Sequence, residues 1–141
     1  MPITPEELTR RVRAATPFID TLDITIVAAG DGRAVARLPV TKGLTQDLGH
    51  PHGGVVGAFA DFICNLALRE ASVTVEYKVN FLRGAPARAL RAEGEVVRAG
   101  RSIAVVEARI FAEAEDRDDV EVARATATLM PMYRDKPSRD A

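Results

Sequence analysis

The sequence predicts a single α+β domain in which an antiparallel sheet wraps around one long apolar helix. The chain has 141 residues, enough for one sizeable core but too few for two. Its hydrophobic periodicity follows the order helix, β, β, helix, β, β, β, β. Four consecutive β segments joined by short turns favour an antiparallel sheet. The second helix, which contains the apolar run Val55 to Leu68, must be covered on every side.

The first helix is predicted from Thr4 to roughly Ala15. Thr4 can cap it, Pro5 suits its first turn, and Glu7 completes a capping box. Pro17 is expected to mark its end. We therefore divide the chain into an N-terminal helix (1–18), one main domain (19–132) and a charged C-terminal tail (133–141).

The β segments are predicted from alternating apolar residues and turn signals. The motif "GDG" at 30–32 predicts a hairpin between the segments 23–30 and 33–40. After the helix, alternation predicts four more strands, at 72–82, 88–98, 102–115 and 120–132. Gly94 interrupts one of them, which predicts a bulge or a close approach of the backbone to a neighbour.

Net charge, cysteine content and the lengths of apolar runs limit the classes of function that this sequence predicts. The formal net charge is −1, which gives no electrostatic reason to expect nucleic acid or an anionic membrane as a partner. Cys64 is the one cysteine, so no intrachain disulfide can form. The first residues lack the apolar core of a signal peptide, and the run Val55 to Leu68 is too short for a membrane span. These features predict a cytoplasmic protein that binds neither nucleic acid nor membrane.

One carboxylate, Asp61, interrupts the apolar helix. An ionised carboxylate there costs several kcal/mol unless it is paired or solvated. Within the helix only Asn65, one turn later, is a polar partner on the same face. Asp61 is therefore either a general base or nucleophile facing a cleft, or a structural residue that caps a loop or pairs with an arginine of the sheet.

Glycines stand at the start of the same helix. The N–H groups of a first helical turn lack intrahelical partners and can hold an anion or a developing oxyanion. Gly53 and Gly54 have no side chains, so a ligand carbonyl could approach their backbone closely. Eight residues separate Gly53 from Asp61, a rise of roughly 12 Å. If both serve one reaction, they must come from two protomers of a dimer.

These residues resemble a known family. "HGG" at 52–54, with Asp61 nine residues after His52, is similar to the hotdog-fold thioesterases of the phenylacetic-acid-pathway type. The similarity continues in "TVEYKVNFLRGA" (74–85), "GEVVRAGRSIAVVEARIF" (94–111) and "VARATATLMP" (122–131), so it covers roughly residues 20–131. The resemblance implies the hotdog fold, a long helix wrapped by an antiparallel sheet.

The resemblance also implies hydrolysis of an acyl-coenzyme A thioester. In that interpretation the Gly53 N–H polarises the thioester carbonyl, and Asp61 of the other protomer activates water or attacks directly. His52 positions the oxyanion hole, and Gly54 shapes the turn. Thr74 matches a Ser or Thr that holds the water or the carboxylate.

Two positions depart from the family pattern. Relatives carry Asn six residues before the motif histidine, where this chain has Gln46, whose amide is the same but reaches further. Strict alternation also places Thr74 on the face of Glu76 and Lys78, away from the predicted site.

The remaining site residues are expected to contact the substrate. Arg83, Arg88, Arg98 and Arg101 are candidates for the phosphates of coenzyme A, and "AGRS" resembles the family segment near the nucleotide. The residues predicted to bind substrate are Gly54, Asn65, Arg83, Gly100, Arg101 and Ser102. No cofactor is expected, because coenzyme A is part of the substrate. His50, His52 and Asp61 lack an established ligand spacing, so no metal is expected either.

Two other functions remain open at this stage. An enoyl-thioester hydratase or dehydratase could use the same fold, and so could a non-catalytic module that binds acyl-coenzyme A. The sequence does not choose between a dimer and a tetramer, or between general-base and nucleophilic roles for Asp61. Phe59, Phe62 and Phe81 are candidates either for an acyl tunnel or for the core.

Overall fold

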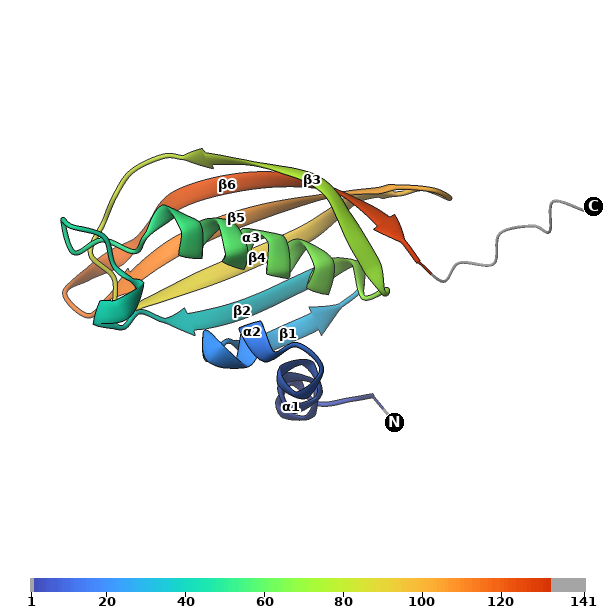
Figure 1. Ribbon diagram of the computed structural model, residues 1–141, viewed down its shortest axis with the longest axis horizontal. Coiled ribbons are helices and arrows are strands. Elements are labelled where there is room, and N and C mark those ends of the chain that lie inside the picture. The colour runs from blue at the N-terminus through green and yellow to red at the C-terminus, as the bar shows by residue number, and fades with distance from the viewer. Residues whose placement is uncertain (1, 133–141) are drawn as a thin grey trace, which may run out of the picture.

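The computed structural model describes residues 2–132, so the predicted tail, 133–141, lies outside the described residues. The chain forms a single curved sheet around a central helix, with two short helices at its N-terminal end (Figure 1). In chain order the elements are α1 (Pro5–Ala15), α2 (Pro17–Thr21), β1 (Thr25–Gly30), β2 (Arg33–Pro39), a 3-10 turn η1 (Lys42–Leu44), α3 (Gly53–Leu68), β3 (Ser72–Phe81), β4 (Ala89–Ala99), β5 (Ala104–Ala114) and β6 (Arg117–Pro131).

The six strands form one antiparallel sheet in the order β1-β2-β4-β5-β6-β3. The predicted α+β class and antiparallel sheet are thus confirmed. The expectation of short turns throughout the last four strands is wrong at one place. β3 pairs with β6 and not with β4, so residues 82–88 carry the chain from one edge of the sheet back to its middle. β3 and β1 are therefore the two edge strands.

The core lies between α3 and the concave face of the sheet. Phe59 and Ile63 of α3 are fully buried, as are Leu90 of β4 and Ile110 of β5. Gly94 permits this close packing, because a Cβ there would lie 2.8 Å from the carbonyl oxygen of Ile63. The close approach predicted at Gly94 is confirmed, and the bulge of β4 lies instead between Val96 and Arg98.

The N-terminal segment contains one helix more than predicted. Thr4 caps α1, and its side chain accepts a hydrogen bond of 3.2 Å from the Glu7 N–H. Pro17 follows the end of α1, as expected, but it also begins α2. Proline fits this place because the first helical turn needs no backbone N–H donor, and the α2 segment is too short for periodicity to reveal it.

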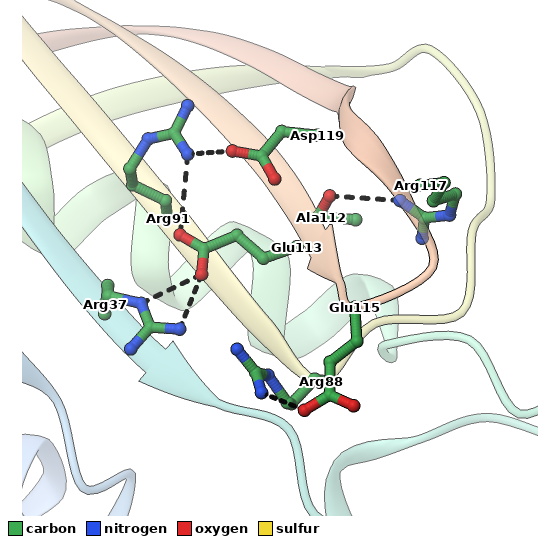
Figure 2. Close-up of polar contacts among 8 residues, drawn as sticks. All are labelled: Arg37, Arg88, Arg91, Ala112, Glu113, Glu115, Arg117 and Asp119. Carbon is green, nitrogen blue, oxygen red and sulfur yellow. Dashed lines mark hydrogen bonds and ion pairs between the residues drawn. The ribbon is translucent and has the colours of Figure 1, made fainter.

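The convex face of the sheet is covered by charged side chains. Figure 2 shows Glu113 of β5 between Arg37 of β2 and Arg91 of β4, and Arg91 also pairs with Asp119 of β6. Ion pairs at exposed positions contribute only up to about 1 kcal/mol each, while the half-buried Arg91 and Glu113 are screened less by solvent. Their chief consequence is that this face carries paired charges, while the glycine-rich turn and Asp61 belong to α3 on the opposite face.

Candidate functional site

The site begins at the N-terminus of α3, where His52 is the capping residue. Its Nδ1 atom accepts a hydrogen bond of 2.9 Å from the Gly54 N–H. Its carbonyl oxygen accepts from the N–H groups of Val55 and Val56. Because Nδ1 accepts this hydrogen bond, the ring N–H is on Nε2. The geometry therefore gives His52 a positioning contact with the turn.

The Gly53 N–H differs from its neighbours because no hydrogen bond within residues 2–132 uses it. It opens onto a pocket of about 300 Å³ that Gln46, His50, Phe81 and Arg83 help to line. A free N–H at the positive end of a helix is suited to a carbonyl oxygen that gains negative charge.

Gln46 holds the loop that precedes α3. Its Oε1 atom accepts hydrogen bonds from the N–H groups of Leu48, at 2.5 Å, and His50, at 3.3 Å. The carbonyl end of the side chain is thus used within the loop. The hydrogen bonds of the described chain leave its Nε2 group unused, and this residue borders the pocket at Gly53. His50 lines the same pocket, with its ring against Gly84.

Asp61 lies two turns further along α3 and is held by neutral polar groups. Its Oδ1 atom accepts a short hydrogen bond of 2.6 Å from the Thr74 hydroxyl. The Asn65 amide nitrogen lies 3.3 Å from the same atom and donates to the Thr74 oxygen at 3.1 Å. Ser72 orients Asn65 by donating to its Oδ1 atom at 2.8 Å. Within residues 2–132, Asp61 forms no ion pair, and its Oδ2 atom accepts no hydrogen bond. One oxygen therefore remains available for chemistry.

The position of Thr74 corrects the expectation from strict alternation. A β-bulge interrupts the pairing of β3 with β6, because Thr74 lies opposite Leu129 while Glu76 lies opposite Thr128. Val75 is the extra residue. The bulge turns Thr74 to the face of the buried Leu129, toward α3, whereas Glu76 stays on the outer face and accepts a hydrogen bond from Thr128.

Asp61 opens onto a second and larger pocket, with a volume of about 810 Å³. We call it the Asp61 groove. It runs between α1–α2 and α3, and its lining includes Asn65 and Ser72, Phe62 of α3, Tyr77 of β3, and Leu8, Val12 and Phe18 of the N-terminal helices. The three phenylalanines considered from sequence separate clearly. Phe59 is core, Phe62 lines this groove, and Phe81 lines the pocket at Gly53.

Ser72 and Tyr77 are site residues that the sequence interpretation did not single out. Ser72 is two positions before Thr74, so alternation alone places both on one face of the strand. The Tyr77 hydroxyl lies over Gly57, one turn before Asp61. Strict alternation places Tyr77 and Thr74 on opposite faces of β3. The bulge at Val75 brings them to the same face, opposite Ala127 and Leu129.

The structure separates Gly53 from Asp61. Both lie on the continuous helix α3, eight residues apart, which corresponds to roughly 12 Å along its axis. They also open onto two different pockets, and no residue lines both. A single thioester group bound to one chain therefore does not reach both the Gly53 N–H and the Asp61 carboxylate.

The residues predicted to contact coenzyme A fall at two ends of the sheet. Arg83 borders the pocket at Gly53. The turn between β4 and β5 contains Gly100, Arg101 and Ser102 and leads into Ala104, the first residue of β5. Ala104 pairs with Leu129 of β6, which in turn pairs with Thr74 of β3. That turn thus lies at the Asp61 end. Arg88 forms an ion pair with Glu115 on the charged face (Figure 2).

Cys64 is close to Asp61 in sequence but is not part of the groove. Its side chain is buried, and its Sγ atom lies 3.8 Å from the carbonyl oxygen of Val106. Burial, and secondarily the nearby Asp61 charge, raises the pKa of the thiol to about 12. A thiol with this pKa is protonated at neutral pH, so Cys64 is a core residue and not a nucleophile.

Within residues 2–132 no three histidine, cysteine or carboxylate side chains converge to form a metal site. None of the helices in this part of the chain has the length and apolar character needed to cross a membrane.

Comparison with known proteins identifies the family. Residues 48–117 match the model of the Thioesterase superfamily. A 1,4-dihydroxy-2-naphthoyl-CoA hydrolase of Listeria monocytogenes is 30% identical over 102 residues, which cover 68% of this chain and 83% of that protein. A Saccharolobus solfataricus protein is 33% identical over 91 residues, which cover 61% of this chain and 65% of that protein, just under two thirds of its length.

Solved structures agree with this result. A thioesterase family protein from Silicibacter pomeroyi has a TM-score of 0.80 and 35% identity, covering 86% of this chain and 93% of that one. A phenylacetic acid degradation-related protein from Ralstonia eutropha has a TM-score of 0.74 and 26% identity, covering 87% and 96%. The curved sheet around a central helix and these similarities together show that the chain belongs to the thioesterase superfamily, a family of thioester hydrolases, and has its hotdog fold.

Proposed function

We propose that this protein hydrolyses the thioester of an acyl- or aryl-coenzyme A, with Asp61 as its catalytic carboxylate. The observation that carries the proposal is the arrangement of Asp61. Thr74 and Asn65 hold one oxygen, and the other is unused at the wall of a groove with apolar sides. The naphthoyl-CoA hydrolase from Listeria monocytogenes supports the substrate class.

The reaction needs no cofactor. As a general base, Asp61 accepts a proton from water while the water oxygen bonds to the thioester carbonyl carbon. The carbonyl oxygen becomes an oxyanion that the Gly53 N–H stabilises. The C–S bond then breaks, and the thiolate of coenzyme A takes up the proton to leave as a thiol. As a nucleophile, Asp61 would instead bond to the same carbon while the C–S bond breaks, and the thiolate of coenzyme A would leave and take a proton from water. Water would then hydrolyse the mixed anhydride to the free acid and the Asp61 carboxylate.

The supporting roles follow from the contacts already described. His52 fixes the turn through Gly54, next to Gly53 at the border of its pocket. Gln46 braces the preceding loop and has an amide group free for the substrate. Thr74 and Asn65 hold the carboxylate in one rotamer.

The complete site is built from two protomers in this proposal, since Gly53 and Asp61 of one chain open onto different pockets. β3 offers a surface for pairing with a second copy. It ends the sheet with one edge unpaired by any strand of residues 2–132, and Val73 and Val75 on it are 47% and 58% exposed. Such an edge is a template for strand pairing between chains. A homodimer is the smallest assembly with two such sites, and two dimers could form a tetramer.

Binding of coenzyme A would then involve both chains. If Gly53 of one protomer meets Asp61 of its partner, Arg83 of the first and the turn 100–102 of the second border the same site. Arginine binds phosphate through paired N–H donors, so Arg83 and Arg101 are the proposed phosphate contacts. Gly100 and Ser102 would contribute backbone and hydroxyl contacts.

The test is release of coenzyme A thiol from a panel of acyl- and aryl-CoA thioesters. Wild type is measured beside Asp61→Asn and Asp61→Ala. We expect both variants to remain folded and to lower kcat by at least about 100-fold, because they lack the group that accepts the proton. Wild-type turnover by folded Asp61→Ala would overturn the mechanism. Binding of the thioesters without hydrolysis by wild type would support the non-catalytic module instead.

A further inference from the structure

We propose that α1 and α2 form the wall that selects the acyl group, and that they favour a bulky apolar acyl or aryl group over a short one. The inference rests on the proposed thioesterase function and adds the part of the substrate that this chain selects. Its basis is the lining of the Asp61 groove. Leu8, Val12 and Phe18 come from a segment of the chain that forms no hydrogen bond with Asp61 within the described residues.

The N-terminal helices are fixed in place by polar bonds and leave apolar surface unused. The Thr9 hydroxyl accepts a hydrogen bond of 2.9 Å from the Ile26 N–H, and Arg13 donates at 2.9 Å to the Ile24 carbonyl oxygen. Arg13 also pairs with Asp23 at 2.8 Å. These bonds hold α1 against β1. No residue of α1 is fully buried, although Leu8 and Val12 pack partly against the core.

The groove combines a polar cluster at Asp61 with a larger apolar lining. The polar groups, Asp61, Asn65 and Ser72, lie together along α3 and the start of β3. The apolar lining comes from Leu8, Val12 and Phe18 of α1 and α2 and also from Ala58, Phe62 and Leu66 of α3. Figure 1 shows the two N-terminal helices on one side of α3. A thioester whose reacting carbon lies at Asp61 would place its acyl group against the N-terminal helices.

Size and exposure agree with a large apolar group. The groove volume of about 810 Å³ lies in the range of pockets that bind drug-sized ligands. Phe18 is 55% exposed and lines this groove, so an acyl group that covers it removes apolar surface of both partners from water. An acetyl group offers only one methyl group to such a wall, so it would gain less from it than a longer acyl chain.

The test compares kcat/KM across a series of saturated acyl-CoA thioesters from acetyl to decanoyl, with benzoyl- and phenylacetyl-CoA as aryl probes. Val12→Trp fills the groove, and Phe18→Ala removes its exposed ring. We expect each variant to lower the ratio of decanoyl to acetyl kcat/KM by at least about tenfold, because contacts with methylene groups set such ratios. Val97→Trp is the matched control. It adds the same bulk at an exposed position of β4 outside the groove and should keep the wild-type ratio.

The outcomes separate this inference from the proposed function. If the wild-type protein hydrolyses none of these thioesters, the proposed thioesterase function is disproved. The proposed selection of the acyl group by α1 and α2 is then disproved as well. Wild type that depends on Asp61 while folded Val12→Trp and Phe18→Ala keep its acyl-length profile disproves the wall alone. If circular dichroism shows that Val12→Trp does not fold, Phe18→Ala decides the question, since truncation of an exposed ring costs little stability.

Discussion

At the scale of single residues, the central result is how this chain keeps a carboxylate in its apolar helix. Asp61 is half-buried, and its partners are a hydroxyl and an amide, not a cation. Neutral donors satisfy one oxygen and leave the charge uncompensated by any arginine within the described residues. An arginine partner would stabilise the carboxylate and make it a weaker base. The arrangement thus favours the catalytic interpretation over a structural ion pair.

The hydroxyl of Thr74 is expected to control turnover through Asp61. Thr74→Val keeps the shape of the side chain but loses the 2.6 Å hydrogen bond. A hydrogen bond to a charged group is worth about 1.5–3 kcal/mol, so we expect kcat to fall by about 10- to 100-fold with little change in KM. Steady-state kinetics with an acyl-CoA checks this.

Thr74→Ser is the matched control, because it restores the hydroxyl and should restore most of kcat. A purely structural role of the hydroxyl would instead lower the unfolding free energy of Thr74→Val while the folded variant kept its kcat. Unchanged kcat in Thr74→Val would rule out the positioning role.

Some features of these site residues could be predicted from the sequence and others could not. The glycines after His52 predicted where α3 begins. Because helical geometry is regular, the eight residues from Gly53 to Asp61 also predicted how far apart the two groups lie. The orientation of Thr74 could not be predicted by the same means. A single bulge at Val75 reverses which face of β3 a residue occupies, and the sequence contains no glycine or proline there to mark it.

At the scale of elements, the close packing of α3 against β4 requires a glycine at position 94. The backbone of β4 approaches α3 so closely that a side chain at Gly94 would meet the Ile63 carbonyl oxygen and the Ala67 methyl group. The helix carries the Gly53 N–H at one end and Asp61 two turns further on, so its seating on the sheet positions both halves of the site. The interruption of the β pattern at Gly94 predicted either a bulge or a close approach, and the structure has the close approach there.

Gly94→Ala is therefore expected to destabilise the protein. Its Cβ would lie 2.8 Å from backbone oxygen and 3.2 Å from the Ala67 Cβ, and neither can move without shifting α3. Overpacking of this kind costs about 1–3 kcal/mol. Denaturant unfolding should show that loss in the free energy of unfolding.

Gly43→Ala is the control for this experiment, because a Cβ at Gly43 meets nothing within 4 Å. It should leave the stability within about 0.5 kcal/mol of wild type. Equal stabilities of the two alanine variants would show that α3 can shift away from β4 at no cost.

At the scale of the whole molecule, the succession of strands and of the two longer helices along the chain was predictable, but the order of strands within the sheet was not. Alternation and turns predicted six strands, since both are local signals. That β3 lies at the edge beside β6 depends on pairing between residues far apart in the chain, for which a single sequence has no signal. This placement also leaves one edge of β3 unpaired within the described residues. β3 contributes residues to both pockets, Phe81 to the one at Gly53 and Ser72 and Tyr77 to the Asp61 groove.

A site shared between two chains predicts complementation between two inactive variants. Gly53→Pro removes the N–H that would polarise the carbonyl, and proline is tolerated at the first position of a helix. Asp61→Ala removes the carboxylate. In a mixed dimer, native Gly53 of one chain meets native Asp61 of the other at one of the two sites. Random mixing should therefore restore about a quarter of wild-type thiol release per chain.

Two further measurements make this experiment decisive. Gly53→Ala keeps the N–H and places its Cβ at an ordinary 3.4 Å from the Phe81 ring, so it should stay active if the N–H is what Gly53→Pro loses. Native mass spectrometry of differently tagged chains reports how many mixed dimers form. If mixed dimers form and activity does not return, each site lies within one chain, and α3 would have to deform to bring Gly53 and Asp61 to one thioester. If activity returns in proportion to mixed dimers, neither chain alone holds a complete site, and hydrolysis depends on assembly.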